Sequence, residues 1–390
     1  MGAMTTPSSP PVIISVDDHL IEPPDMFEGR MPAALVDDAP HVEELPDGKQ
    51  VWLYEGNIYA NIGLNAVVGR PKEEWSMEPA RFDEMRPGCY DIDARISDMD
   101  TGGIWASLCF PSLLAGFCGS VFSRSKDPDL GLACVRAWND WHAEVWAGTH
   151  PERIIPLQIP WLNDPAVAAD ELRRNAARGF KAVSFADFPA KLGLPSLHTR
   201  HWDPFLAACE ETGTVLCLHT GSGGWAPIPS PDPPFELFPT LFPVSALVAA
   251  SDWLWSGVCH RFPELRIAMS EGGIGWVAML ADRADYVLDH SASGVDSHSW
   301  QDDLRPSEVL ARNFWFCSID DPSTVDGLLA RFGPDHLMVE SDYPHADSTW
   351  PDTPAVVDRN YGHLPADVVR KVTYANAAAL FDHPLPEGVQ

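Results

Sequence analysis

The sequence is poor in basic residues, in paired cysteines and in long hydrophobic runs. Lys and Arg number 26 against 56 Asp and Glu, which gives a formal net charge of −30 at pH 7. Because this charge repels nucleic acids and anionic membrane surfaces, we expect neither as a partner. An acidic substrate is still compatible with it, since a metal ion or a local Arg/Lys cluster can reverse the field inside a pocket.

The 8 cysteines are scattered singly and form no Cys-x-x-Cys pair. This usage is typical of reduced, buried thiols in a cytosolic protein. No apolar run reaches the roughly 18 residues of a membrane span, and the N-terminus lacks the charged and apolar regions of a signal peptide. We therefore expect a soluble, cytoplasmic protein. The opening stretch MGAMTTPSSPP, residues 1–11, is interpreted as a cloning remnant and flexible tail.

Several catalytic motifs are also missing. The sequence has no Walker phosphate loop, no dinucleotide-binding glycine motif and no Gly-x-Ser-x-Gly nucleophile elbow. Nucleotide-dependent and serine-hydrolase activities therefore lack support.

What is present is a regular alternation of strand and helix patterns. Hydrophobic residues make up 45% of the chain, enough for a sizeable core. Helical patterns occur between several short apolar runs that are rich in β-branched residues. We predict eight strands, within residues 11–19, 103–111, 153–160, 181–186, 214–220, 265–273, 313–319 and 336–345. Eight parallel βα units predict an α/β fold of the TIM (β/α)8 barrel type.

Two segments interrupt the alternation, so the predicted barrel is distorted. Residues 30–92 form an insertion after the first strand, with a hairpin centred on Gly56-Asn57. Residues 221–243 follow the fifth strand and are too rich in Pro and Gly for a helix or a central strand, so we interpret them as a lid or pocket wall. Both segments are assigned to a single domain over residues 12–385.

Metal-capable side chains fall at the predicted strand ends, where barrel enzymes carry their active sites. Asp17 and His19 are two residues apart on the first strand and so share a face, although a solvated Asp beside a hydrogen-bonded His would give the same letters. His219 ends the fifth strand and Asp342 follows the eighth. Two carboxylates and two imidazoles suit one divalent ion, Zn²⁺ or Mn²⁺.

Other polar residues near these positions have several interpretations. Glu22 is a further ligand, a residue that orients a ligand, or a plain loop carboxylate, and the last is favoured. His345 either reaches into the pocket, toward substrate or Asp342, or faces water. Glu340 is expected to pair with a cation outside the barrel. Arg95 either holds a substrate carboxylate or, as we favour, pairs with Asp98 or Asp91.

Aromatic residues are concentrated in the segment 221–243. Trp225, Phe235, Phe238 and Phe242 could line a pocket for an apolar or aromatic substrate, anchor the loop, or form a dimer contact. His142, on a Trp-rich helical segment, is interpreted as structural.

The sequence resembles the amidohydrolase superfamily through Asp-x-His on the first strand, His on the fifth and Asp on the eighth. It is similar, more narrowly, to the branch with aminocarboxymuconate semialdehyde decarboxylase and γ-resorcylate decarboxylase. The stretches that carry this similarity are DDHLIEPPDMF, DMDTGGIWASLCFPS, SEGGIGW, ESDYPHADSTWP and VTYANAAALF. The resemblance implies a distorted TIM barrel, often a dimer, with one divalent metal on Asp17, His19, His219 and Asp342.

Two departures from the family pattern bear on the chemistry. Dinuclear members use a Lys at the end of strand four, whereas Lys181 begins that strand here and its end reads Ala186-Asp187, which favours a mononuclear site. The decarboxylases carry a His at the end of strand six, where this chain has Glu271. Glu271 could orient a metal-bound water, act as a general base, or cap the following helix.

The predicted site supports two enzyme reactions on a small-molecule substrate. A metal-activated water, with Asp342 or Glu271 as proton acceptor and His345 as a further contact, would hydrolyse an amide, ester, lactone or activated C–C bond. The same metal could bind a substrate carboxylate for nonoxidative decarboxylation. Because the His of strand six is missing, we place hydrolysis first and decarboxylation second. A hydratase and a non-catalytic binding barrel are more distant alternatives.

Overall fold

The computed structural model describes residues 12–75, 79–291 and 300–389, so the predicted tail at residues 1–11 lies outside it. Each predicted strand contains an observed one, and all pairings between them are parallel. These strands are β1 (Ile14–His19), β5 (Ala106–Phe110), β6 (Ile154–Ile155), β7 (Leu157–Gln158), β8 (Ala182–Phe185), β9 (Val215–His219), β10 (Ile267–Ser270), β11 (Phe314–Ser318) and β12 (Leu337–Val339).

The barrel closes at Pro156. Strand β5 pairs with β6 through Ser107 and Ile154, and β7 pairs with β8 through Leu157 and Ala182. Only Pro156, which has no N–H for a strand ladder, separates β6 from β7. Since β6 and β7 are one interrupted strand, the two ends of the sheet order meet there. The predicted TIM barrel is confirmed.

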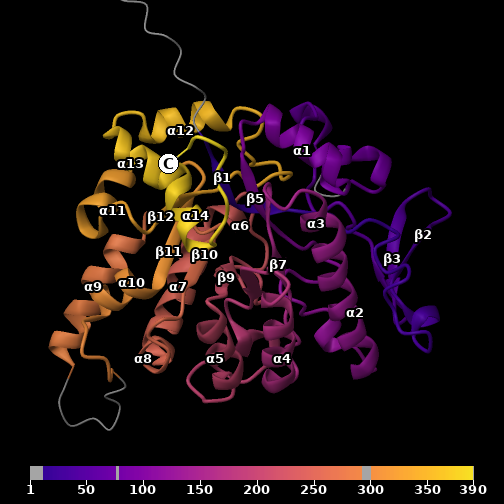
Figure 1. Ribbon diagram of the computed structural model, residues 1–390, viewed down its shortest axis with the longest axis horizontal. Coiled ribbons are helices and arrows are strands. Elements are labelled where there is room, and N and C mark those ends of the chain that lie inside the picture. The colour runs from indigo at the N-terminus through magenta and orange to yellow at the C-terminus, as the bar shows by residue number, and fades with distance from the viewer. Residues whose placement is uncertain (1–11, 76–78, 292–299, 390) are drawn as a thin grey trace, which may run out of the picture.

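Helices surround the barrel, as Figure 1 shows, and pack on the outward faces of the strands. The helices of the outer layer include α1 (Ile92–Thr101), α2 (Pro128–Trp141), α4 (Pro165–Ala176), α5 (Asp203–Thr212), α7 (Phe242–Trp255), α9 (Val277–His290), α10 (Pro306–Asn313), α11 (Val325–Phe332) and α12 (Thr353–Tyr361). Alternate strand residues face inward, among them Val215, Cys217 and Met338, and form a core that α14 (Asn376–Leu380) joins.

The insertion after β1 holds the predicted hairpin, displaced by one residue. Strands β2 (His41–Glu44), β3 (Gln50–Tyr54) and β4 (Asn57–Tyr59) form a three-stranded antiparallel sheet beside the barrel (Figure 1). Tyr54 pairs with Asn57, so the turn residues are Glu55 and Gly56 rather than Gly56 and Asn57. Both have positive φ, which a two-residue hairpin turn of this kind requires.

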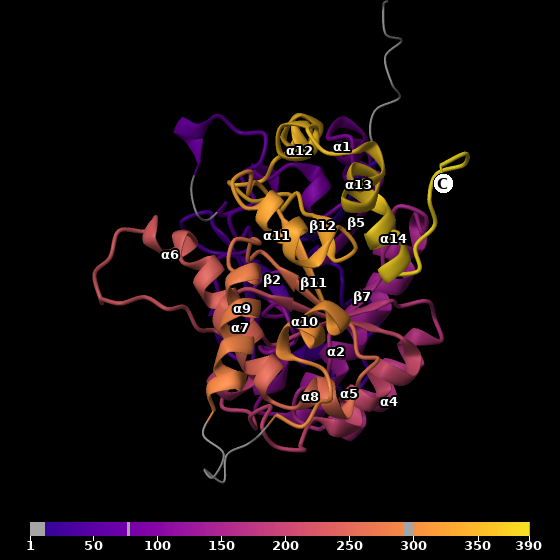
Figure 2. The same ribbon diagram turned by 90° about the vertical axis from the view of Figure 1, so that its left-hand side faces the viewer.

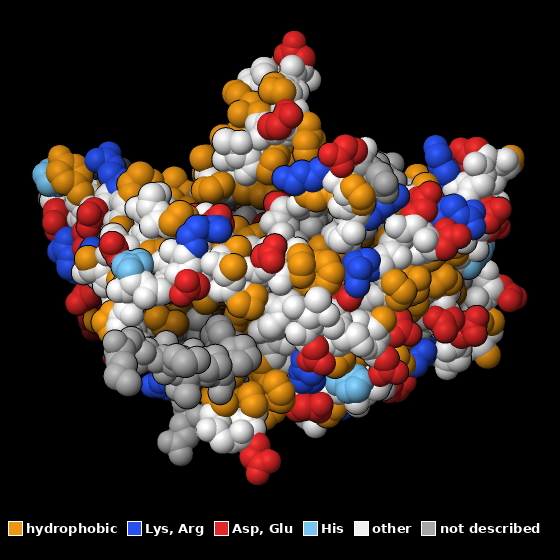
Figure 3. All heavy atoms as spheres, turned by 90° about the horizontal axis from the view of Figure 1, so that it is seen from above, with side chains coloured by type: hydrophobic (Ala, Val, Ile, Leu, Met, Phe, Trp, Pro, Cys, Tyr) orange, Lys and Arg blue, Asp and Glu red, His pale blue; other side chains and the backbone are white. Residues whose placement is uncertain are grey.

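The segment 221–243 departs from the prediction at its end. A short helix, α6 (Leu237–Thr240), forms within it, and α7 begins at Phe242, so the exclusion of helix is wrong there. Pro243 occupies the first turn of α7, where the missing N–H is not needed. The loop carrying α6 projects from the barrel in Figure 2. Figure 3 shows the molecule from above, and this side of it points upward there. The projection on that side carries mostly hydrophobic side chains, with acidic groups at its tip.

All 8 cysteines are free and buried, as predicted. Within the described residues, none of the helices combines the length and the hydrophobicity that a membrane crossing requires.

Candidate metal centre

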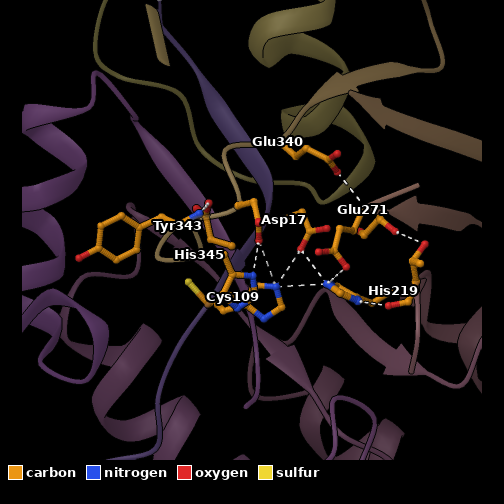
Figure 4. A network of polar contacts seen from close by, with 12 residues as sticks. Asp17, Cys109, His219, Glu271, Glu340, Tyr343 and His345 are labelled. Atoms are coloured by element: carbon orange, nitrogen blue, oxygen red, sulfur yellow. Dashed lines mark hydrogen bonds and ion pairs between the residues drawn. The ribbon is translucent and has the colours of Figure 1, made fainter. Parts of the chain in front are cut away.

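The four predicted metal ligands meet at the carboxyl ends of the strands. Figure 4 labels two of them, Asp17 and His219. Asp17 Oδ1 lies 3.8 Å from His19 Nε2 and 3.6 Å from His219 Nε2. Asp342 Oδ1 lies 3.4 Å from His19 Nε2, and the two imidazole Nε2 atoms are 3.1 Å apart. The structure therefore brings together side chains from strands β1 and β9 and from the loop after β12.

A register shift in β1 aims its side chains at this centre. Ile14 and Val16 belong to the inward-facing core, so strict alternation would send Asp18 inward and Asp17 and His19 outward. The pairing of β1 with β5 shifts within the strand before Asp18. Such a shift re-aims the residues that follow it, which places Asp17 and His19 inside the barrel mouth.

The donor atoms at the centre fit a divalent cation. Asp17 and Asp342 are buried, yet none of their four carboxylate oxygens accepts a hydrogen bond from a backbone N–H or a hydroxyl group among the described residues, and only imidazole nitrogens lie near them. His219 Nδ1 lies 2.8 Å from the carbonyl oxygen of Thr220, to which it donates, so the lone pair of Nε2 points to the centre. Buried carboxylates without donors are unfavourable unless a cation compensates them, and a mixed N/O set of this kind suits Zn²⁺ or Mn²⁺.

Burial and neighbouring charges shift the pKa values of the side chains at the centre. Burial, with the nearby Glu340 and Asp342 carboxylates, raises the pKa of Asp17 well above its usual value. Burial lowers the pKa of His19 to about 4 and that of His219 well below its usual range. Burial would also raise the pKa of Asp342, but the neighbouring His345 and His19 hold it well below its usual value.

Two residues at the centre have left-handed backbone conformations. Glu271, directly after β10, has φ 57°, and Asp342, in the loop after β12, has φ 58°. Few residues other than glycine adopt this region, and such strain concentrates at functional sites. The glycine that follows Glu271 is required by packing, because a Cβ on Gly272 would lie 2.3 Å from the Cβ of Ala246 on α7.

Glu271 faces the centre and does not cap a helix. Its Oε2 lies 3.4 Å from His219 Nε2, and burial together with the Asp342 charge raises its pKa well above the usual value. Helix α9 begins at Val277 after Trp276, so the capping interpretation of Glu271 is wrong.

His345 also reaches the centre. Its Nδ1 lies 2.9 Å from Asp342 Oδ1, and its ring centroid lies 4.1 Å from that of His19. Its Nε2 is buried and has no hydrogen-bond partner among the described residues. Of the two interpretations of His345, the structure excludes the one in which it faces water.

Three charged residues outside the centre have surroundings that differ from those predicted from the sequence: Glu340, Glu22 and Arg95. Glu340 does not pair with a cation: it is buried, accepts a hydrogen bond from the Glu271 N–H at 3.1 Å, and burial raises its pKa to about 8. Glu22 is buried rather than a plain loop carboxylate, and it accepts hydrogen bonds from Ser112 and from Trp138 Nε1. Neither environment was visible in the sequence, because both depend on the closed barrel.

Arg95 is the third case, and the favoured pairing with Asp98 or Asp91 is wrong. Its guanidinium donates to the carbonyl oxygens of Gly88 and His19 and stacks 4.2 Å from the Tyr343 ring. Asp98 pairs instead with Arg86, and Asp91 caps α1. Arg95 thus supports the backbone of β1 from behind the centre.

A cavity of about 480 Å³ opens next to the donor atoms. Its lining includes His219, Glu271 and His345 together with aromatic side chains, which are Trp75, Phe117, Phe235, Phe238 and Phe242. Three of the four loop aromatics therefore line a pocket, as one interpretation predicted. Trp225 is the exception, since it packs on Phe188 with ring centroids 5.0 Å apart and anchors the loop.

Sequence reasoning missed three residues around the cavity. Phe117 packs against the rings of His219 and His19, with centroids 4.8 and 5.4 Å apart. Asp347 brings a carboxylate oxygen within 4.8 Å of oxygens of Glu271 and Asp342. Asp187 holds the start of the long loop, as described next. Only Asp347 had a usable signal, its position two residues after His345.

Asp187 binds the glycine-rich turn that begins the 221–243 segment. Its carboxylate accepts hydrogen bonds from the N–H groups of Gly221 at 3.1 Å, Gly223 at 2.5 Å and Phe188 at 2.9 Å. A Cβ on Gly223 would lie 2.5 Å from that carboxylate, so this position requires glycine. The end of strand β8 therefore fixes the root of the loop rather than carrying a metal ligand.

The comparisons with known proteins agree with this geometry. Residues 62–383 match the protein-family model described as amidohydrolase, which is more than half of the chain. The chain belongs to the amidohydrolase family. The family predicted from the sequence is thereby confirmed.

The relatives of this family member include named decarboxylases. It is 22% identical over 269 residues to 2-amino-3-carboxymuconate-6-semialdehyde decarboxylase of Dictyostelium discoideum, a match that covers 67% of this chain and 69% of that protein. An amidohydrolase structure from Mycobacterium avium subsp. paratuberculosis K-10 matches with a TM-score of 0.75 at 23% identity, covering 95% of this chain and 98% of the other.

A third match carries a metal. The dihydroxybenzoic acid decarboxylase of Polaromonas sp. JS666, solved with bound manganese and the inhibitor 2-nitroresorcinol, matches with a TM-score of 0.63 at 16% identity, covering 96% of this chain and 97% of the other. At these identities, both structures establish the shared fold.

Proposed function

We propose that the protein is a metal-dependent nonoxidative decarboxylase of a small aromatic or unsaturated carboxylic acid. One observation carries this proposal: a cavity walled by phenyl rings reaches His219, Glu271 and His345, which lie next to the buried carboxylates of Asp17 and Asp342. The named relatives, two of which are decarboxylases, support carboxy-lyase chemistry over the hydrolysis that we first predicted from the sequence.

Asp17, His19, His219 and Asp342 would hold one divalent ion, Mn²⁺ or Zn²⁺. The ion, when bound, supplies a Lewis acid for substrate oxygen atoms. A dinuclear site lacks support, because Lys181 pairs with Asp382 at 2.7 Å, outside the barrel mouth. Manganese in the Polaromonas enzyme supports the same metal class here.

The cavity side chains would orient the substrate and exclude water. Phe117, Phe235, Phe238 and Phe242 would pack on its ring or unsaturated chain. The unpartnered Nε2 of His345 can donate a hydrogen bond to a substrate oxygen, while Nδ1 holds Asp342 in place.

Glu271 would supply the proton that replaces the carboxylate. The bond between the substrate carbon and its carboxylate breaks, CO₂ leaves, and the electron pair left on that carbon takes the proton of the Glu271 carboxyl group. Water then returns a proton to Glu271. Its position on the cavity wall, 3.4 Å from His219 Nε2, supports this role.

The test measures CO₂ release by protein reconstituted with Mn²⁺ or Zn²⁺ from a panel of hydroxybenzoates and unsaturated acids. Glu271→Gln should lower release by about 10²-fold or more while metal content is unchanged. Glu171→Gln, a matched change at a buried carboxyl group that pairs with Arg136 and does not line the cavity, should have little effect. Absence of CO₂ release from all acids, with metal bound, would reject the decarboxylase.

Hydrolysis is the second candidate, because the Glu271 carboxylate could instead accept a proton from a water molecule at the same place. Turnover of esters, lactones or amides without CO₂ release would favour it.

We also propose a homodimer. Exposed hydrophobic side chains on α7 and α9, which contact each other, support a protein interface there; they are Val244, Val248, Met279 and Tyr286. Light scattering should give twice the chain mass, and Met279→Lys should lower it.

A further inference from the structure

The cavity next to the metal centre has an unusual charge balance. No Lys or Arg lines it among the described residues, and the segments outside them contain no Lys or Arg in the sequence. Its acidic side chains are Glu271, in the loop after β10, and Asp347, in the loop after β12. The walls therefore offer no fixed positive charge to a substrate anion.

Two side chains near the cavity, His345 and Arg95, can carry a positive charge, but neither changes this balance. His345 lines the cavity, but its Nδ1 lies 2.9 Å from Asp342 Oδ1, so a proton on the ring is already neutralised by that carboxylate. Arg95 lies behind β1, where its guanidinium is used by the Gly88 and His19 carbonyl oxygens.

We infer that the site accepts acids with one carboxylate and rejects acids with a second one, and that Asp347 is the residue that sets this preference. This inference rests on the proposed function, whose substrate class it narrows. The single carboxylate would bind at the centre, and the rest of the molecule, neutral or cationic, would lie among the aromatic rings. A second carboxylate would have no cation to meet and would approach the carboxylate of Asp347.

Asp347 is the better determinant of the two acidic residues. It is exposed at the cavity mouth, whereas Glu271 lies deeper, against His219. One Asp347 oxygen lies within 4.8 Å of oxygens of Glu271 and Asp342, a distance at which like charges still repel strongly near a protein surface. Asp347 forms no ion pair with a Lys or Arg among the described residues; partial burial and Asp342 raise its pKa to about 6, while His345 favours its charged form.

The experiment compares two ligands that differ only in the second carboxylate, 2-hydroxybenzoate and 2-hydroxyisophthalate. Their dissociation constants for the Mn²⁺-loaded protein are measured by isothermal titration calorimetry at pH 7. We expect the monocarboxylate to bind at least about tenfold more tightly. Asp347→Asn should narrow this ratio, and Asp347→Arg should reverse it.

Asp358→Arg is the matched control, since Asp358 is exposed on α12 and does not line the cavity. It should leave the ratio unchanged although it alters the net charge equally. Equal or tighter binding of the dicarboxylate by the unmodified protein would overturn the inference. A ratio that shifts as much in Asp358→Arg as in Asp347→Arg would also overturn the role of Asp347.

Parallel CO₂ measurements separate this inference from the proposed function. Selective binding of monocarboxylates without CO₂ release from any acid would reject the decarboxylase and keep the ligand class. CO₂ release from dicarboxylates at rates equal to those of monocarboxylates would do the reverse.

Discussion

Two sets of buried carboxylates lie close to the barrel mouth and differ in one respect. Glu22, Asp18 and Asp187 accept hydrogen bonds from backbone N–H groups and from Ser or Trp side chains. Asp17 and Asp342 are buried as deeply, yet their oxygens accept no hydrogen bond from a backbone N–H group or from a Ser or Trp side chain among the described residues, and only imidazole nitrogens lie near them. Carboxylates of the first set stabilise the fold, and those of the second are arranged for a cation that the protein chain does not provide.

The largest effect should come from the unpartnered set. Asp342→Ala removes a proposed metal ligand, so we expect loss of bound metal and a fall in CO₂ release of roughly 10³-fold or more, which corresponds to several kcal/mol of charge stabilisation. Metal analysis and a CO₂ assay check this. The variant also removes the carboxylate that lies 2.9 Å from His345 Nδ1, so the apo protein should lose some stability as well. Retention of bound metal by the variant would contradict this comparison.

Metal removal should come next in size. Binding at about 10³ times the dissociation constant stabilises a protein by about 4 kcal/mol, so a chelator should lower the denaturant midpoint accordingly. Asp17→Asn should show little further change on chelation. Equal effects of the chelator on both proteins would show that the metal binds elsewhere.

A change in the hydrogen-bonded set should act on stability alone. Glu22→Ala leaves the Ser112 and Trp138 N–H groups buried without an acceptor, and we expect it to lower the free energy of unfolding by about 3 kcal/mol. Urea denaturation measures this, while metal content should remain that of the unmodified protein. Metal loss on Glu22→Ala would move Glu22 into the other set.

The smallest effect concerns a buried imidazole outside both sets. His142 packs against Trp138 and Phe180, neither ring nitrogen has a hydrogen-bond partner among the described residues, and burial lowers its pKa to about 3. The unfolded chain takes up a proton below about pH 6.5, while the folded chain does so only near pH 3. The stability contribution of neutral His142 is therefore present above pH 6.5 and falls as the pH drops toward 3.

His142→Phe should remove this loss, so its advantage over the unmodified protein should grow by about 2 kcal/mol between pH 6.5 and 5. Thermal or urea unfolding across that range measures it. A parallel pH dependence of the two proteins would show that His142 does not titrate in the unfolding reaction.

Much of the barrel and of the centre could be predicted from the sequence. Each strand is a short apolar run, and Asp17, His19, His219 and Asp342 follow such runs where parallel strands end. What failed depended on contacts between distant segments. The burial of Glu22 and Glu340, and the use of Arg95 by the His19 carbonyl oxygen, arise only when the sheet closes. The register shift in β1 also has no local signal, although it decides which face Asp17 occupies.

The left-handed backbone of Glu271 and Asp342 has an evolutionary consequence. Glycine is the residue that adopts this conformation most readily, and a single nucleotide change converts a Glu or Asp codon into a Gly codon. Either mutation would relax the backbone and delete the side chain, so the chain could lose its chemistry while its fold became no weaker. Drift under selection for stability alone would favour that outcome. Both acids therefore occupy backbone positions that glycine would adopt at a lower conformational cost.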